Sequence, residues 1–593
     1  MKFIFLGALL LSPLLKAQIP GEAEKAKAAR AILDSWHQES PRAEERTLHF
    51  VLWTPNDREP PAEYQARLTR IMEHIQDFYR KEMDRLGFGP RSIKLPKNPE
   101  GGVKIHLIKG EHPTSHYEMD SGSDIRKECL PVLRESGINA EKETLVIFCN
   151  LATWDPEKLT FVHKSPYYAG GNYQGGTAWQ LDSPELDVTN LSKKEPIIRD
   201  GQYGSISLGK HNSIFIGGVC HELGHALGLP HCKERPDEAA RGTALMGSGN
   251  RSYGDELRGE GKGSFLTLAH ALRLASHPQF SGSTKGMNLP VKAEISDLSL
   301  TAKGKTIHVS GTLTADPPAY AVVAYFDPDG GSDYNATTAT AVPDADGNFT
   351  LSCDALPAGK TGELRLHPLY VNGSTGGWMS QTKFRYPYSV GKDGTPDLST
   401  FQFKAILAPI VEALNKRDQT GAQKLADQLD GRAAVIAGNL INKDAQPVAT
   451  PAQLGDAEGK KFPLTNFKPS QEKIGWGRPA YNHLPNPSLL LESGGKIFTT
   501  GIYAHAPARH TYDLGKKFTK FSGLAGLSGS RGSAQFEIKG DGKTLWRSKT
   551  LKQGQLANYA VDLTGIETLE LLTHPTNDGT GGDWALWLDP VLE

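Results

Sequence analysis

A short segment of the chain combines three histidines and a glutamate at spacings that suit metal chemistry. His221, Glu222 and His225 are followed by Gly228 and then by His231. On a helix, positions four apart differ by about 40° in rotation, so His221 and His225 project from one face. Gly228 suits the left-handed residue that ends a helix, after which the chain can turn and bring His231 to the same point. Three neutral imidazoles with one position left for water are the ligand set of a catalytic zinc site.

Glu222 supplies the group that such a site needs for hydrolysis. Its carboxylate follows the first predicted ligand and can reach a water molecule at the metal. Zinc lowers the pKa of that water toward ~7, and Glu222 then takes its proton as a general base and returns it to the leaving amine. The pattern therefore predicts amide hydrolysis with one zinc ion as cofactor. Two other interpretations stay open: a helix whose histidines bind nothing, and a site that binds metal without catalysis.

The residues around this segment have the pattern of a mixed α/β domain. Apolar runs predict buried strands, and apolar residues at helical spacing predict helices. The expected strands are residues 49–53, 103–108, 144–148 and 177–181, the last an edge strand, and the expected helices are residues 61–86, 125–133, 214–227 and 266–275.

The histidine segment and the turn after it resemble the metzincin metallopeptidases. The resemblance rests on His-Glu-x-x-His-x-x-Gly-x-x-His and on Met246 in an Ala-Leu-Met-Gly turn. It implies that Met246 lies beneath the metal and supports the ligands by packing. Some branches place a tyrosine two residues after the methionine, where this chain has Ser248, and Tyr253 is a candidate substitute. The resemblance also implies a substrate extended along the edge strand, with Trp179 and Gln180 as candidate contacts, although Trp179 could equally be core.

The middle of the chain changes character twice. Short alternating strands at residues 307–313, 321–326, 349–352 and 363–370 predict an Ig-like β-sandwich. Within it, Asp327, Asp329 and Asp333 could form a calcium loop, but Pro328 and the neighbouring glycines favour a surface turn, so no calcium site is assigned. A helical spacer is expected to follow, over residues 393–455.

The C-terminal stretch resembles a carbohydrate-binding module of the galactose-binding sandwich type (NPCBM-like). The residues that carry this resemblance are 474–477, 501–507, 512–515 and 583–589. Sugar sites need an aromatic face and fixed polar groups. The candidate glycan contacts are Trp476, His505, Arg509 and Trp584, each of which could equally have a structural role.

Composition and the N-terminus indicate an exported protein. The 66 Lys and Arg balance 67 Asp and Glu, for a net charge of −1, which argues against a nucleic-acid partner. Residues 1–17 have the short basic start, apolar core and small final residue of a signal peptide, so we expect a secreted, extracellular or periplasmic protein without a membrane span. Five cysteines are too few for a disulfide scaffold, and at least one cannot pair within the chain: Cys129, Cys149, Cys220, Cys232 and Cys353.

These parts define a multi-domain α+β fold class. The expected order is a signal peptide (1–17), an N-terminal arm or short pro-segment (18–45), a metzincin-like α/β catalytic domain (46–287), an Ig-like β-sandwich (288–392), a helical spacer (393–455) and a galactose-binding-like β-sandwich (456–593).

The pairing of a peptidase pattern with a glycan-binding pattern predicts a glycosylated substrate. A secreted, monomeric zinc endopeptidase acting on mucin-type O-glycoproteins is the first hypothesis. The alternatives are a general protease tethered to glycans, and a glycan-binding adhesin with a degenerate peptidase domain. A glycoside hydrolase would need paired carboxylates, which the spacing does not identify.

Overall fold

The computed structural model describes residues 19–38, 46–330, 333–377, 382–443, 447–455, 459–486, 489–529 and 532–593. The predicted signal peptide lies outside these ranges. Among the described residues, no helix combines the length and the apolar character needed to cross a membrane. The chain divides into two compact units: residues 1–356 with 364–385, and residues 357–363 with 386–593.

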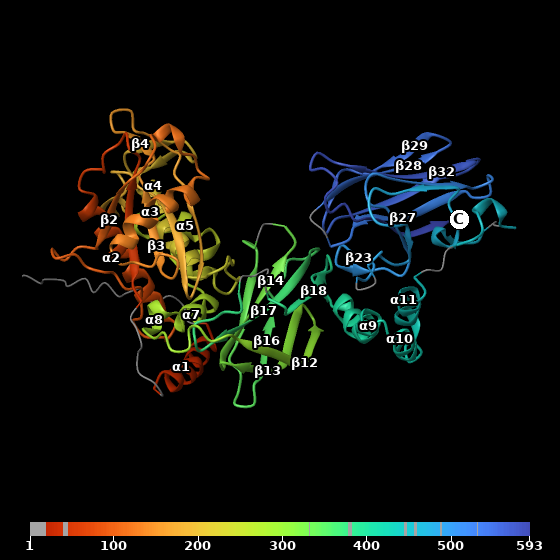
Figure 1. Ribbon diagram of the computed structural model, residues 1–593, viewed down its shortest axis with the longest axis horizontal. Helices are drawn as coiled ribbons and strands as arrows, with labels where there is room; N and C mark the ends of the chain where they lie inside the picture. Colours follow the sequence, from red (N-terminus) through yellow and green to blue (C-terminus); the bar gives the residue numbers. More distant parts are fainter. Residues whose placement is uncertain are drawn as a thin grey trace, which may run out of the picture. The chain divides into compact units, whose positions relative to one another are not determined.

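A five-stranded sheet forms the centre of the first unit, in the order β2-β1-β3-β7-β6 (Figure 1). Strands β1, β2, β3 and β7 are parallel, and β6 pairs with β7 antiparallel at the edge. The strands are β1 (Leu48–Thr54), β2 (Ile105–Lys109), β3 (Thr144–Cys149), β6 (Tyr168–Asn172) and β7 (Gly175–Leu181). A second sheet, in the order β4-β5-β8-β9, contains β4 (Ala152–Asp155), β5 (Thr160–His163), β8 (Ile197–Asp200) and β9 (Gly204–Ser207).

Alternation along the strands buries both faces of the five-stranded sheet. Phe50 and Val146 join one core with α2 (Tyr64–Arg85), α4 (Leu208–Ala226) and α7 (Leu268–Ala275). Val51 and Ile147 join another with α3 (Gly122–Glu135). Because successive side chains of a strand point to opposite faces, α3 lies on the face of the sheet opposite α2 and α4. The N-terminal arm forms α1 (Glu22–Gln38), which packs into the first core.

The prediction that residues 177–181 form the edge strand is wrong. The glycine-rich segment before them is itself a strand, β6, and it occupies the edge. A Cβ atom at Gly171 or Gly176 would collide with the carbonyl oxygen of Ala226, the last residue of α4. These glycines therefore allow the β6–β7 hairpin to pack against the end of the helix that carries the histidines.

The β-sandwich contributes to the core of the first unit. One sheet has the order β12-β13-β16, and the other contains β15-β14-β17. Tyr320 and Val323 of β14 belong to the same hydrophobic cluster as α2, α4 and α7, and the Tyr320 hydroxyl donates to Ser276 Oγ at 3.0 Å. The strands are β12 (Lys292–Lys303), β13 (Thr306–Asp316), β14 (Ala319–Pro328), β15 (Thr337–Ala341), β16 (Asn348–Cys353) and β17 (Thr361–Tyr370).

The second unit contains three helices and a larger β-sandwich. Helices α9 (Ser399–Asn415), α10 (Gln419–Ala426) and α11 (Gly431–Ile441) share a hydrophobic core that includes Ile497. The sandwich consists of the sheets β22-β25-β33-β27-β31 and β21-β26-β32-β28-β29. Its longer strands are β26 (Ala508–Asp513), β27 (Lys520–Leu527), β28 (Ser533–Gly540), β29 (Lys543–Arg547), β31 (Leu556–Asp562), β32 (Thr568–Pro575) and β33 (Ala585–Leu592), and its short ones are β21 (Gln471–Lys473), β22 (Ala480–Tyr481) and β25 (Gly501–Tyr503).

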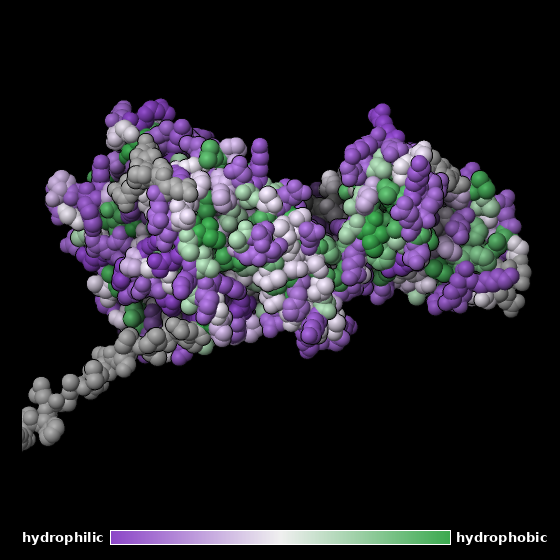
Figure 2. Space-filling model, turned by 90° about the horizontal axis from the view of Figure 1, so that it is seen from below, coloured by the Kyte–Doolittle hydropathy of each residue, from purple (hydrophilic) through white to green (hydrophobic). Residues whose placement is uncertain are grey.

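Most of the face shown in Figure 2 is hydrophilic, and its hydrophobic residues gather in limited patches. Among the described residues of the second unit, Trp476 is a large aromatic residue that is 56% exposed. An exposed aromatic ring of this size is a candidate contact for a ligand.

Candidate metal centre and glycan-contact site

Helix α4 begins and ends with well-defined caps that set the position of its histidines. At its start the Ser207 side chain accepts a hydrogen bond from the Lys210 backbone N–H at 3.0 Å. At its end Gly228 has φ +86°, its N–H donates to the His225 carbonyl at 2.9 Å, and the Leu229 N–H donates to the Gly224 carbonyl at 2.9 Å. This is a Schellman motif, whose left-handed residue is most often glycine. It turns the chain back toward the helix.

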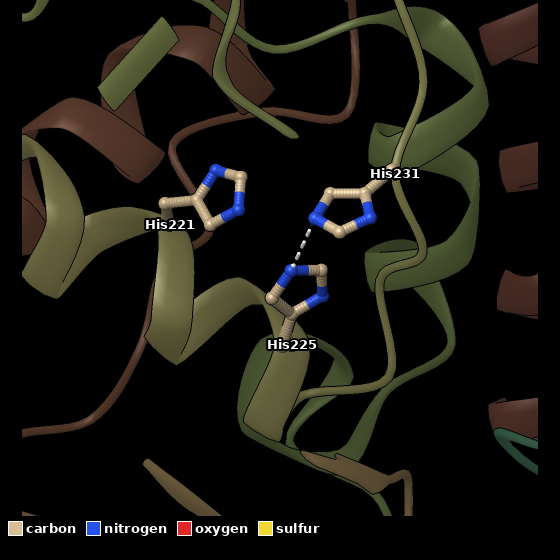
Figure 3. A group of neighbouring side chains, drawn as sticks. All are labelled: His221, His225 and His231. Atoms are coloured by element: carbon tan, nitrogen blue, oxygen red, sulfur yellow. Dashed lines mark hydrogen bonds between the residues drawn. The ribbon is translucent and has the colours of Figure 1, made fainter. Parts of the chain in front are cut away.

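The three histidines converge as the sequence predicts. Their ligand atoms lie within 4.8 Å of one another, and His225 Nε2 is 3.0 Å from His231 Nε2. Figure 3 shows the rings of His221 and His225, from the helix, and of His231, from the returning segment, directed toward a common point. Convergence of one nitrogen from each ring leaves a site that a single ion can occupy.

Backbone carbonyls hold two of the rings in the tautomer that metal binding needs. His221 Nδ1 lies 2.7 Å from the Leu245 carbonyl oxygen, and His225 Nδ1 lies 2.7 Å from the Leu229 carbonyl oxygen. A carbonyl only accepts, so each Nδ1 carries the proton and each Nε2 keeps its lone pair.

Burial keeps the imidazoles neutral. It lowers the pKa of His221 and of His231 to about 3 and also lowers the pKa of His225. Neutral imidazoles in a tripod fit zinc. The donor set therefore satisfies the requirements of the predicted cofactor.

Glu222 is buried beside the first histidine. Burial raises the pKa of its carboxyl to about 8. A nearby cation would favour the charged form and lower that pKa again. The carboxyl can thus exchange a proton near neutral pH, as a general base requires.

Met246 packs directly against the histidine helix. It is fully buried, and a Cβ atom added to Gly224 would lie 2.6 Å from its sulfur. The residue before it, Leu245, supplies the carbonyl that holds His221. The turn around Met246 is therefore coupled to the histidine helix by packing and by a hydrogen bond.

The structure places the predicted substrate contacts elsewhere in the first unit. Trp179 lies on the α3 face of the sheet, with its ring 5.0 Å from that of Tyr168. Gln180 is fully buried, and its side-chain amide donates to the Val219 carbonyl at 3.3 Å. Tyr253 is 3% exposed, and its ring contacts His74 and Phe78. None of the three has a described contact with the histidine tripod, and their roles in substrate binding stay predictions.

Sequence reasoning missed a tyrosine at the site. Tyr334, between β14 and β15 of the sandwich, stacks on His231 with ring centroids 3.6 Å apart and an interplanar angle of 26°. Burial raises the pKa of its hydroxyl, and the Glu222 carboxylate adds to that increase. No sequence signal identifies it, because it lies far from the histidine segment along the chain.

In the second unit, three of the four predicted glycan contacts lie together. The Trp476 ring stacks with that of Trp584 at 5.7 Å and 29°, and lies 5.8 Å from the His505 ring. Arg509 instead forms an ion pair with Glu570 on the β26–β32 ladder.

A carboxylate that the sequence analysis did not select lies next to this aromatic cluster. Asp583 is fully buried, and its Oδ1 accepts a hydrogen bond from the Ser533 backbone N–H at 3.1 Å. Its Oδ2 has no hydrogen-bond partner among the described residues. The sequence signal that could have identified Asp583 is its position directly before Trp584, a candidate glycan contact.

The structure also describes the cysteines and the aspartates that were considered for a calcium loop. All five cysteines are free thiols and buried. Asp327 and Asp333, considered for a calcium loop, each form an ion pair with Arg365. Both carboxylates thus have a cationic partner within the protein.

Residues 460–593 match the NPCBM/NEW2 domain family. A Renibacterium salmoninarum protein, provisionally named an endo-alpha-N-acetylgalactosaminidase, is 29% identical over 101 residues, which are 16% of this chain and 7% of that protein. The chain therefore spans a small part of this curated relative.

Solved structures similar to the chain include OgpA from Akkermansia muciniphila, in a catalytically inactive form with an O-glycopeptide substrate. It is 25% identical, with a TM-score of 0.46 over 56% of this chain and 93% of OgpA. Another is the CBM51 of a Clostridium perfringens GH95 protein in complex with methyl-galactose, at 20% identity and a TM-score of 0.22, covering 23% of this chain and 100% of that one.

Proposed function

We propose that the protein is an exported zinc-dependent endopeptidase that hydrolyses peptide bonds in glycosylated proteins, with mucin-type O-glycoproteins as the substrate class. The observation that carries the proposal is the histidine tripod. Three ring nitrogens converge within 4.8 Å, two of them oriented by backbone carbonyls, next to a buried glutamate.

His221, His225 and His231 would hold the zinc. When bound, zinc acts as a Lewis acid and lowers the pKa of water in the site. The Glu222 carboxylate takes a proton from the attacking water and later donates it to the amide nitrogen that leaves. The Leu245 and Leu229 carbonyls keep the two helix imidazoles in fixed tautomers throughout.

The glycan part of the proposal rests on the second unit. Residues 460–593 match a carbohydrate-binding domain family, and in this domain Trp476 and Trp584 present a stacked aromatic pair. The apolar face of a sugar ring packs on such aromatic side chains, while polar groups bind its hydroxyls. Asp583 Oδ2, a buried acceptor at the cluster, is suited to a sugar hydroxyl. A peptidase site and a glycan site in one chain favour a substrate that carries both.

The test is digestion of one defined mucin-type glycopeptide, analysed by mass spectrometry. We expect cleavage that requires the sugar, stops with a chelator and returns with zinc. Glu222→Gln should abolish cleavage and still bind zinc, because the amide cannot accept the proton. This variant is the matched control for a contaminating protease.

Each alternative gives a different result. Equal cleavage of the peptide without its sugar, together with digestion of casein, would indicate a general protease. Activity unchanged by Glu222→Gln would leave an adhesin, and sugar release insensitive to chelation would indicate a glycoside hydrolase.

Glycan binding is tested separately by calorimetry with galactose and N-acetylgalactosamine. We expect Trp476→Ala to abolish measurable binding. Arg509→Ala serves as the comparison, because Arg509 is ion-paired to Glu570. Equal loss in both variants would contradict the assignment of the site to the aromatic cluster.

A further inference from the structure

A residue of the β-sandwich lies directly over one predicted metal ligand. The Tyr334 ring stacks on His231 at 3.6 Å, while 45% of the side chain remains exposed. Within the described part of the chain, the hydroxyl of Tyr334 has no hydrogen-bond partner. The ring is held in place and the hydroxyl is available to a ligand.

Hydrogen bonds join the segment that carries His231 to the segment that carries Tyr334. The Lys233 backbone N–H donates to the Ala336 carbonyl at 2.7 Å. Arg235 Nη1 donates to the Thr338 carbonyl at 3.3 Å. Ala336 is fully buried in the core shared by the sandwich and the histidine helix. The stacked pair is therefore supported on both sides by fixed backbone.

An ion-pair clamp positions the residue before the tyrosine. Arg365 on β17 contacts Asp327 at 3.0 Å through Nη2 and Asp333 at 3.0 Å through Nη1. The Arg365 and Asp327 side chains are 14% and 10% exposed, so solvent screens this pair only partly. Asp333 has φ +67°, a left-handed conformation that is uncommon for a residue with a side chain. The clamp stabilises this conformation and thereby directs Tyr334 toward the tripod.

The hydrolysis of an amide creates negative charge on the carbonyl oxygen, and a preorganised donor near that oxygen accelerates the reaction. The ordinary pKa of a phenol, near ~10, already leaves it protonated at neutral pH and able to donate. Tyr334 supplies a partly exposed phenol in contact with the tripod.

We propose that Tyr334 is a catalytic residue whose hydroxyl donates a hydrogen bond to the scissile carbonyl oxygen as it becomes tetrahedral, and that Arg365 is its positioning residue. This inference rests on the proposed function. It gives the β-sandwich a part in the active site.

Tyr334→Phe tests the donor, because it removes the hydroxyl and keeps the stacked ring. We expect kcat on the glycopeptide to fall by about 10²–10³-fold. Zinc stoichiometry and the melting temperature should not change. Tyr386→Phe, which removes a hydroxyl from β18 (Arg385–Val390), is the matched control and should keep full activity.

Two binding measurements separate transition-state from ground-state contacts. A phosphinic peptide, which mimics the tetrahedral state, should bind Tyr334→Phe more weakly by the same factor as the loss of kcat/KM. The uncleaved glycopeptide should bind Glu222→Gln and the Glu222→Gln/Tyr334→Phe double variant with affinities within about twofold. Equal weakening of both ligands would assign Tyr334 to substrate binding and overturn the proposal.

Arg365→Gln tests the positioning role. We expect faster hydrogen exchange at residues 333–336 and a kcat between those of the wild type and Tyr334→Phe. Faster exchange with unchanged kcat would refute the role of Arg365.

Failure of the inference differs from failure of the proposed function. A wild-type protein that cleaves no glycopeptide with zinc would refute both. A wild-type protein that cleaves, and a Tyr334→Phe variant that cleaves equally well, would refute the role of Tyr334 alone.

Discussion

Contact between Gly224 and Met246 allows a quantitative test of how the methionine turn supports the ligand helix. In Gly224→Ala the new Cβ would lie 2.6 Å from the Met246 sulfur and 3.2 Å from its terminal carbon, so the methionine must move. Overpacking of this kind costs about 1–3 kcal/mol. Replacing glycine by alanine inside a helix contributes about 1 kcal/mol in the opposite direction. The net expectation is a loss of about 0–2 kcal/mol.

A shift of Met246 should also change the geometry of the candidate metal site. The preceding residue, Leu245, supplies the carbonyl that orients His221. Disturbing a partner of a metal-ligating histidine typically weakens metal binding by about 10–100-fold. We therefore expect Gly224→Ala to lower zinc affinity by at least about 10-fold. Competition with a chromophoric chelator measures this affinity.

A double-mutant cycle isolates the contact. Met246→Ala alone should cost about 2–5 kcal/mol, because it truncates a fully buried side chain. In that background the second change, Gly224→Ala, meets no sulfur and should be stabilising by about 1 kcal/mol. The sign of its effect thus reverses, for a coupling energy of about 1–3 kcal/mol.

Gly438→Ala in α11 is the matched control, because a Cβ there would meet nothing within 4 Å. Calorimetry should follow the two compact units as separate transitions, since a single unfolding free energy is not defined for a chain of this kind. If Gly224→Ala stabilises its unit as much as Gly438→Ala does and leaves zinc affinity intact, the packing argument is wrong.

Three further predictions concern stability of the first unit. Arg67→Ala should cost about 3–5 kcal/mol, because Asp182, 2.7 Å away and 1% exposed, would lose its buried cationic partner; a change under 1 kcal/mol in calorimetry would contradict this. Burial alone lowers the pKa of His211, but hydrogen bonds from its ring to Asp200 and Glu185 outweigh burial and raise it. The stabilisation from charged His211 is therefore complete below the unfolded pKa of about 6.5 and is lost as pH rises through the pKa of His211 in the folded protein. The melting temperature should fall over that rise in pH. An equal fall of the melting temperature in His211→Gln would refute the assignment of this effect to His211. Adding zinc to metal-free protein should raise the melting temperature with ligand concentration as mass action requires, and calcium at equal concentration should not.

The convergence of the three histidines could be predicted from the sequence because its geometry is local. The spacing of His221 and His225 converts to one helix face through backbone geometry alone, and Gly228 marks the turn that returns His231. The spacing of apolar residues along each strand and helix is also a local property of the sequence. The order of elements and the sandwich pattern therefore follow from the sequence without knowledge of the tertiary structure.

The identity of the edge strand could not be predicted in this way. A run of glycines has no hydrophobic period, so the segment that became β6 resembled a loop. Its strand conformation depends on pairing with β7 and on close approach to Ala226 of α4. Both are contacts between segments that are separate in the chain.

Local sequence specifies the chemistry of three imidazoles and a carboxylate on one helix and its returning turn. Contacts between distant segments depend on the fold: Tyr334 on His231, the clamp of Arg365 on Asp333, and the separation of Arg509 from the paired rings of the second unit. The difference arises because side-chain direction within a helix is set by local backbone angles. Contacts between distant segments depend instead on the sum of many packing interactions, which no spacing along the chain encodes.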